Sequence, residues 1–277
     1  MLRHLRILLL LIWLAPAAQP WAADPPVRAV SINLCTDQLL LMLAASNQIT
    51  SVSHLARDPE SSFMAQQAMA YPVNHARLEE LLVLQPDLVL AGAYTEPRLL
   101  RALQRFNIQV EQFSLTSTLS GIEADIRRMA GLLGSTERGE ELIRGMRTKL
   151  SHIQPDPDQA QWPKALFYQP RGYTSGSQTL QDEALRLAGW RNLAAEGGIQ
   201  GYAAIDLETL LLGKPDRIFT SSHTLNAYSR AQQQLQHPAL RKILQDRPPV
   251  EIPFKYWFCA GPMFADAVEL LAAAHAR

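Results

Sequence analysis

One stretch of the sequence occurs twice, and this repetition constrains the fold more than any other feature. The first copy runs from Leu78 to Leu90 and the second from Leu207 to Phe219, 129 residues further along, and the two align without a gap. In each copy a Leu-Glu pair opens a short helical segment, a Pro-Asp turn ends it, and an apolar strand follows. Solenoid repeats recur every 20 to 50 residues or so, so about twice that spacing predicts two similar α/β lobes instead.

The composition is typical of a folded protein and gives no basis for nucleic-acid binding. The chain has 277 residues, of which 47% are hydrophobic, enough to form a substantial core. Lys plus Arg and Asp plus Glu number 26 each, so the formal net charge is zero. We therefore expect no nucleic-acid partner and no binding to an anionic membrane surface. We also expect a monomer.

The first 23 residues have the composition of a secretory signal peptide. Arg3 and Arg6 precede an apolar run from Ile7 to Leu14, and small residues follow it. The run is shorter than the roughly 20 residues that cross a bilayer, although an uncleaved anchor is the alternative. We expect cleavage between Ala17 and Asp24 and export of a soluble protein.

The two cysteines, Cys35 and Cys259, leave three alternatives open. An even pair in an oxidising compartment is typical of a disulfide, but buried thiols or a site for a soft metal ion fit the sequence as well. The geometry that decides between them is not contained in the sequence.

Strands alternate with helices in both halves of the chain. The expected strands of the first half are 27–32, 49–53, 88–91 and 108–113, with helices at 38–45 and 97–106. The expected strands of the second half are 165–168, 217–220 and 250–253, with helices at 180–188, 237–244 and 263–274 and a polar turn at 173–177. Thr36 or Asp37 is the expected cap of the first helix. This alternation is typical of parallel sheets covered by helices.

Residues 118–154 interrupt the alternation and form the expected connection between the lobes. Their apolar residues have helical spacing, which predicts one long helix or two abutting helices that limit lobe closure. The predicted domains are a signal peptide over 1–23, an amino-terminal lobe over 24–117, a backbone helix over 118–154 and a carboxyl-terminal lobe over 155–277.

With its paired Leu-Glu motifs, its helical connection and its signal peptide, the chain resembles the periplasmic solute-binding proteins of metal-chelate importers. That group includes the cobalamin-binding and ferric-siderophore-binding proteins of ABC transporters, and the resemblance covers residues 27–277. It implies two Rossmann-like lobes with parallel sheets, joined by a long backbone helix, and a metal chelate bound in the cleft between them. It also implies a periplasmic location, no cofactor, no catalysis and delivery of the chelate to an ABC permease at the inner membrane.

The same resemblance assigns a role to one glutamate in each copy of the repeat. The glutamates with which such proteins contact arginines of the permease match Glu79 and Glu208, and a carboxylate pairs well with a guanidinium. The alternative is that each glutamate only stabilises the start of its helix.

Ligands of open α/β sheets bind beyond the carboxyl ends of the strands, and this rule selects the candidate ligand contacts. Aromatic residues there offer flat surfaces, arginines pair with acidic groups, and histidine binds metals. The candidates are Cys35, Arg57, Tyr94, Tyr168, Arg171, Tyr173, His223, Tyr256 and Trp257. Core packing is the alternative for each aromatic residue, and a hydrogen-bonded loop position is the alternative for His223. We expect no resident metal site.

Two other classes of function stay open. An exported enzyme is one, although the sequence has no Gly-x-Ser-x-Gly elbow, phosphate loop or His-Glu-x-x-His motif. A solute sensor that serves a membrane receptor without transport is the other. A carrier of free zinc or manganese is disfavoured because the seven histidines are scattered.

Overall fold

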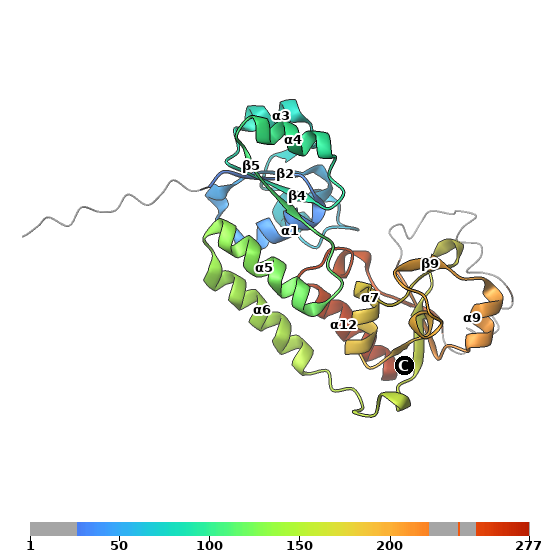
Figure 1. The fold of residues 1–277 in the computed structure, drawn as a ribbon. Helices are drawn as coiled ribbons and strands as arrows, with labels where there is room; N and C mark the ends of the chain where they lie inside the picture. Colours follow the sequence, from blue (N-terminus) through green and yellow to red (C-terminus); the bar gives the residue numbers. More distant parts are fainter. Residues whose placement is uncertain (1–26, 222–237, 239–247, 277) are drawn as a thin grey trace, which may run out of the picture.

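Two parallel sheets, one in each lobe, form the framework of the computed structural model (Figure 1). The structure describes residues 27–221, 238 and 248–276. The predicted signal peptide, most of the predicted helix over 237–244, and His223 lie outside the described residues.

The amino-terminal sheet has five parallel strands in the order β3-β2-β1-β4-β5. They are β1 (Ala29–Ser31), β2 (Ile49–Ser53), β3 (Val73–Asn74), β4 (Leu88–Gly92) and β5 (Gln109–Phe113). The helices between them are α1 (Leu34–Leu43), α2 (Ala65–Ala68), α3 (Leu78–Leu84) and α4 (Pro97–Arg105). The strand order reverses between β1 and β4, and ligands of such sheets bind beyond the carboxyl ends of the strands at this switch point.

The carboxyl-terminal sheet has four parallel strands in the order β11-β10-β6-β8. They are β6 (Lys164–Phe167), β8 (Arg191–Asn192), β10 (Arg217–Thr220) and β11 (Val250–Glu251). The helices are α7 (Leu180–Leu187), α8 (Leu193–Glu196), α9 (Leu207–Gly213) and α12 (Phe264–Ala273). Here the order reverses between β6 and β10, which therefore correspond to β1 and β4.

The segment expected as a polar turn at 173–177 contains a strand instead. β7 (Tyr173–Ser175) pairs in antiparallel fashion with β9 (Tyr202–Ala204). The Thr174 hydroxyl donates to the Phe167 carbonyl oxygen at 2.6 Å, which holds β7 against the end of β6. The turn prediction was wrong because pairing with a distant segment, and not the local composition, determines the backbone here.

The two copies of the sequence repeat form equivalent structures. Asp87 accepts a hydrogen bond from the amide of Arg28 at 2.8 Å, and Asp216 accepts one from the amide of Lys164 at 2.8 Å. The Pro-Asp turns therefore fix β4 against β1 and β10 against β6 in the same way. The predicted repetition is thus also a structural one.

Two helices, α5 (Leu119–Leu133) and α6 (Thr136–Ser151), connect the lobes and form a hairpin (Figure 1). Gly134 has a φ of 67°, so the chain leaves α5 in the left-handed conformation that glycine adopts without strain. Gly139 permits close packing, since an added Cβ would lie 2.7 Å from the Cβ of Ala130. The connection is therefore two helices folded back on each other, and not one continuous helix.

The hairpin contacts both lobes. Glu123 of α5 pairs with Arg147 of α6 at 2.6 Å, which joins the two helices. α5 packs against α1 of the amino-terminal lobe, and α6 packs against α12 of the carboxyl-terminal lobe. Lys149 of α6 also binds Asp266 of α12. Among the helices that the structure describes, none combines the length and the apolar character needed to cross a membrane.

Candidate ligand-binding site

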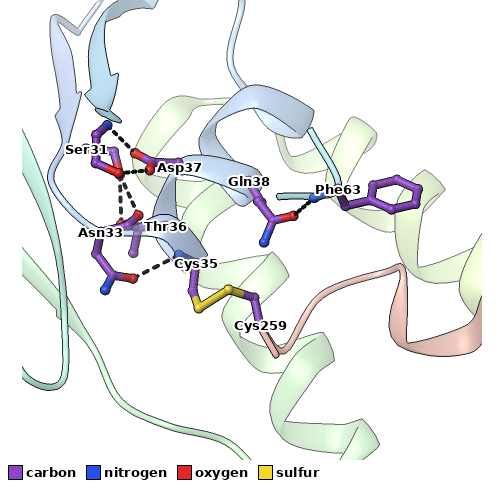
Figure 2. The surroundings of a disulfide bond; sticks show 9 residues. Ser31, Asn33, Cys35, Thr36, Asp37, Gln38, Phe63 and Cys259 are labelled. Atoms are coloured by element: carbon purple, nitrogen blue, oxygen red, sulfur yellow. Dashed lines mark hydrogen bonds between the residues drawn. A yellow bond between two sulfur atoms is a disulfide. The ribbon is translucent and has the colours of Figure 1, made fainter. Parts of the chain in front are cut away.

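A disulfide between Cys35 and Cys259 joins the two lobes at the edges where the switch points lie (Figure 2). Cys35 is in the first turn of α1, directly after β1, and Cys259 lies between β11 and α12. Their Cα atoms are 5.0 Å apart, although 224 residues separate them in the sequence. Of the alternatives that the sequence left open, the structure has the disulfide, so neither sulfur is a free thiol.

The start of α1 is fixed at the switch point by Asn33. Its side-chain oxygen accepts from the amide of Cys35 at 2.9 Å, which makes Asn33 the N-cap (Figure 2). The prediction of Thr36 or Asp37 as the cap was wrong, because both lie within the helix and are buried. The Asn33 carboxamide also lies so close to Gly92, at the end of β4, that a Cβ there would be 2.5 Å away. The ends of β1 and β4 are therefore in direct contact.

Asp37 is a buried carboxyl group that ties α1 to the end of β2. It accepts hydrogen bonds from both the amide, at 2.9 Å, and the hydroxyl of Ser53. Burial raises the pKa of Asp37 from 3.8 to about 7, against the lowering effect of hydrogen bonds from Ser31 and Ser53. Its place in the interior gives it a structural role beside the site.

Two exposed tyrosines, one from each lobe, lie near enough to each other to interact. Tyr94 follows β4 at the switch point and is 86% exposed, and Tyr202 begins β9 and is 63% exposed. The Tyr202 hydroxyl donates to the side-chain oxygen of Gln181 at 3.0 Å. The pKa of Tyr202 is raised, first by loss of hydration and further by the charge of the Tyr94 phenol. A ligand held between the lobes at this point meets both phenols.

Tyr202 was missed in the sequence because β9 was not predicted. Its residues, Tyr202–Ala204, form too short an apolar run to indicate a strand by periodicity. The usable signal was the glycine-rich approach, Gly197 and Gly198 and then Gly201, which indicates a turn that presents the aromatic residue after it.

A second aromatic contact spans the lobes beside the disulfide. Phe63, from the segment after β2, packs against Tyr256, from the segment after β11, with ring centroids 5.8 Å apart. The side-chain oxygen of Gln38 accepts from the amide of Phe63 at 2.8 Å and so fixes this aromatic residue (Figure 2). Trp257 packs against Phe167 and donates from its indole nitrogen to the Ser221 hydroxyl at 2.8 Å. Tyr256 and Trp257 thus lie where the lobes meet.

Tyr168 is in the core, and its prediction as a ligand contact was wrong. It is fully buried and belongs to a cluster with Leu166, Leu210 and Ile218. Side chains alternate between the faces of a strand, so Tyr168 shares the face of Leu166, which packs beneath α9. Burial raises its pKa, with a further contribution from the charge of Asp206.

The two predicted arginines have different surroundings. The guanidinium of Arg57 donates to the carbonyl oxygens of Ala68 at 3.4 Å and Tyr71 at 2.6 Å, so it fixes the end of α2. Arg57 is therefore engaged in the fold, which contradicts its prediction as a ligand contact. Arg171 is exposed beside Tyr173 at the start of β7, and both stay predictions.

Glu79 and Glu208 have the same place in the two lobes. Each is the second residue of its helix, α3 or α9, and each is exposed. In the described part of the chain no group of three or more His, Cys, Asp or Glu side chains is arranged to hold a metal ion.

Comparisons with known proteins agree with this architecture. Residues 30–244 match the model of a family described as periplasmic binding protein. The vitamin B12-binding protein of Photorhabdus laumondii is 27% identical over 201 residues, which are 71% of this chain and 71% of that protein. The periplasmic heme-binding protein RhuT from Roseiflexus sp. RS-1, in apo form, superposes with a TM-score of 0.73 at 21% identity over 90% of this chain and 99% of that one. The periplasmic heme-binding protein HutB of Vibrio cholerae gives a TM-score of 0.72 at 22% identity over 89% and 98% of the two chains. The structural likenesses show a common fold.

Proposed function

The chain belongs to the periplasmic binding protein family, and from this premise we propose that it captures a metal chelate between its lobes and delivers it to an ABC importer. The chelate is a corrinoid, haem or a ferric siderophore. The observation that carries this proposal is the pair of exposed phenols, Tyr94 and Tyr202, which come from different lobes and lie within electrostatic reach of each other.

The chemistry of these side chains suits a large, flat chelate. Exposed aromatic rings on both lobes give stacking surfaces that a planar macrocycle covers on its two faces. A phenol is also a known ligand of haem iron, so Tyr94 is suited to contact the metal itself. The raised pKa of Tyr202 keeps its phenol protonated, which leaves this residue as a hydrogen-bonding and stacking contact.

The names of the related proteins support the same class of ligand. The Photorhabdus relative is named for vitamin B12, and the two structural neighbours are named for heme. Both are metal-bearing macrocycles, and we propose the same class for this chain. We also propose that the protein acts as a monomer without catalysing a reaction, and that residues 1–23 direct it to the periplasm.

We propose that Glu79 and Glu208 dock the two lobes onto the permease. Their matched positions in the repeat and their exposure support this role. Carboxylates on two lobes held by a disulfide and a helical hairpin keep a constant separation, which favours a partner with two fixed cationic sites.

Titration tests the ligand. The purified mature protein is titrated with cyanocobalamin, hemin and a panel of ferric siderophores, with tryptophan fluorescence and chelate absorbance as readouts. We expect saturable binding of one chelate, and at least 10-fold weaker binding in a variant with both Tyr94→Ala and Tyr202→Ala. Binding of no chelate would exclude the proposal.

Charge reversal tests delivery. We expect the double variant Glu79→Arg and Glu208→Arg to bind the chelate as the wild type does and to lose uptake by 100-fold or more in roughly additive steps. If chelate binding falls in parallel with uptake, these residues do not act in docking.

A further inference from the structure

α3 and α9 each expose an apolar side chain on the same face as the glutamate. Val83 lies four residues after Glu79, and Leu212 lies four residues after Glu208. Residues at this spacing are neighbours on one helix face. Val83 is 83% exposed and Leu212 is 74% exposed, and the two are separated by the same 129 residues as the rest of the repeat. The two helices lie at the outer ends of their lobes (Figure 1).

These are the two most exposed aliphatic side chains among the residues that the structure describes. A single exposed apolar side chain needs no explanation. It is the coincidence that requires one, since the two extremes fall on the same position of an internal repeat. Packing does not supply it, because Leu81 and Leu210 provide the buried contacts of these helices.

Helix propensity does not supply it either. Valine is a poor helix former compared with the polar residues that ordinarily occupy an exposed helical position, such as Glu, Gln or Lys. A feature that costs solubility without helping the fold is explained by a surface that is covered by a partner.

We propose that Val83 and Leu212 are apolar contacts of the permease-docking surface, each seated next to a docking glutamate. This inference rests on the function proposed above and names a further part of the same surface. An apolar residue beside a carboxylate excludes water when a partner covers both, which strengthens the attraction between the carboxylate and a partner's arginine or lysine. The partner that fits presents a cation beside an apolar socket, and it presents this pair twice.

Photo-crosslinking tests the contact directly. Benzoylphenylalanine is introduced, one site at a time, at positions 79, 83, 208, 212 and 270 of the full exported chain, and adducts formed in intact cells are identified by mass spectrometry. Leu270 is the control, because it is an exposed leucine on α12, which packs on α6 and α7. We expect adducts with an ABC permease subunit from positions 83 and 212 and none from position 270.

The other outcomes separate the two proposals. Permease adducts from positions 79 and 208, without any from 83 and 212, would overturn the apolar contact and leave glutamate docking intact. Absence of permease adducts from all four repeat positions would overturn both.

Substitution gives the size of the effect. Glutamine is polar and a good helix former, so Val83→Gln and Leu212→Gln remove the apolar surface without weakening the helices. In uptake assays with washed membrane vesicles and the chelate identified by titration, we expect each change to raise the half-saturating concentration of binding protein about 10-fold, and both together about 100-fold. Chelate affinity and melting temperature stay unchanged, as does uptake with Leu270→Gln. An unchanged half-saturating concentration in the double variant would exclude the contact.

Discussion

In the amino-terminal lobe Leu84 ends α3, and at the corresponding place in the carboxyl-terminal lobe Gly213 ends α9. Leu84 packs against the core cluster that contains Leu81 and Leu103. Beneath α9, by contrast, there is a cavity of ≈ 300 Å³ lined by Gly213, Leu193 and other residues. The two copies of the repeat therefore differ in how their inner sides are filled.

The outer sides of the same helices are alike. Glu79 and Glu208 match, Val83 and Leu212 match, and the helices end in the same left-handed conformation at Gln85 (φ 46°) and Lys214 (φ 49°). Core packing requires complementary interiors and places few demands on exposed side chains. Two copies that agree outside and differ inside therefore indicate a requirement imposed by a partner at the surface.

Removal of the disulfide is expected to have the largest effect on this comparison, because it frees each lobe to unfold at its own stability. The bond closes a segment of 224 residues, for which the chain-entropy relation gives a stabilisation of about 5 kcal/mol. All three tryptophans of the described residues, Trp162, Trp190 and Trp257, lie in the carboxyl-terminal lobe. Fluorescence thus follows that lobe, and circular dichroism follows both.

In a variant with Cys35→Ser and Cys259→Ser, we expect the urea midpoints from fluorescence and circular dichroism to fall and to separate. The wild type in the presence of a reductant is the matched comparison. Coincident and unshifted midpoints would mean that the hairpin α5–α6 alone holds the lobes together.

The buried acid of the amino-terminal lobe is expected to have the next largest effect, on the pH dependence of stability. Asp37 of α1 accepts from Ser53 of β2, and Asp182 of α7 accepts from Asn192 of β8 at 2.8 Å, so the lobes share this contact between helix and strand. The folded carboxyl of Asp37 keeps its proton up to a pKa of about 7, whereas the unfolded one loses it near 3.8. The stability that its protonated form contributes is therefore full below about pH 4 and is lost as the pH rises to about 7.

The loss amounts to at most about 4 kcal/mol over that window. We expect Asp37→Asn to flatten the change in unfolding free energy between pH 4.5 and pH 7.5, even though the amide lowers stability overall by facing the Ser53 donors. Asp182→Asn is the control and is expected to keep the wild-type slope. An unaltered slope in Asp37→Asn would show that other groups control this range.

The smallest effects are expected where the interiors differ. Leu84 is half-buried, so Leu84→Ala is expected to lower the unfolding free energy by about 1 to 2 kcal/mol. A Cβ at Gly213 would lie 2.5 Å from a terminal methyl group of Leu193, which is free to move into the adjacent cavity of ≈ 300 Å³. We expect Gly213→Ala to be neutral or stabilising by up to about 0.5 kcal/mol, because alanine favours a helix. Equal losses in both variants, measured by urea unfolding, would mean that the two interiors are equally well filled.

The framework of the sheets could be predicted because its signals are local. The apolar run of β2 over 49–53 and the Pro-Asp turn before β10 over 217–220 gave the observed bounds. The pairing of β7 with β9 and the folding of α5 onto α6 depend on contacts between distant residues, which no local pattern contains.

The site was harder to predict because one residue along a strand changes the face of the sheet that a side chain occupies. This is why Tyr168 is in the core although Tyr94 and Trp257, selected by the same rule, lie toward the other lobe or at the junction of the lobes. Arg57 has the right residue type for an acidic ligand, but free carbonyl groups at the end of α2 bind it. The pairing of Cys35 with Cys259 depended on the docking of one lobe on the other.

The disulfide also imposes an order on how the protein is made. A chain delivered amino end first into an oxidising compartment presents Cys35 early and Cys259 only after 223 intervening residues have followed, none of which is a cysteine. The bond therefore forms only after nearly all of the chain has been delivered, and no thiol between the two competes for either partner. A chain that stops short of Cys259 keeps Cys35 as a thiol, and cells can use that thiol to distinguish an unfinished molecule from a finished one.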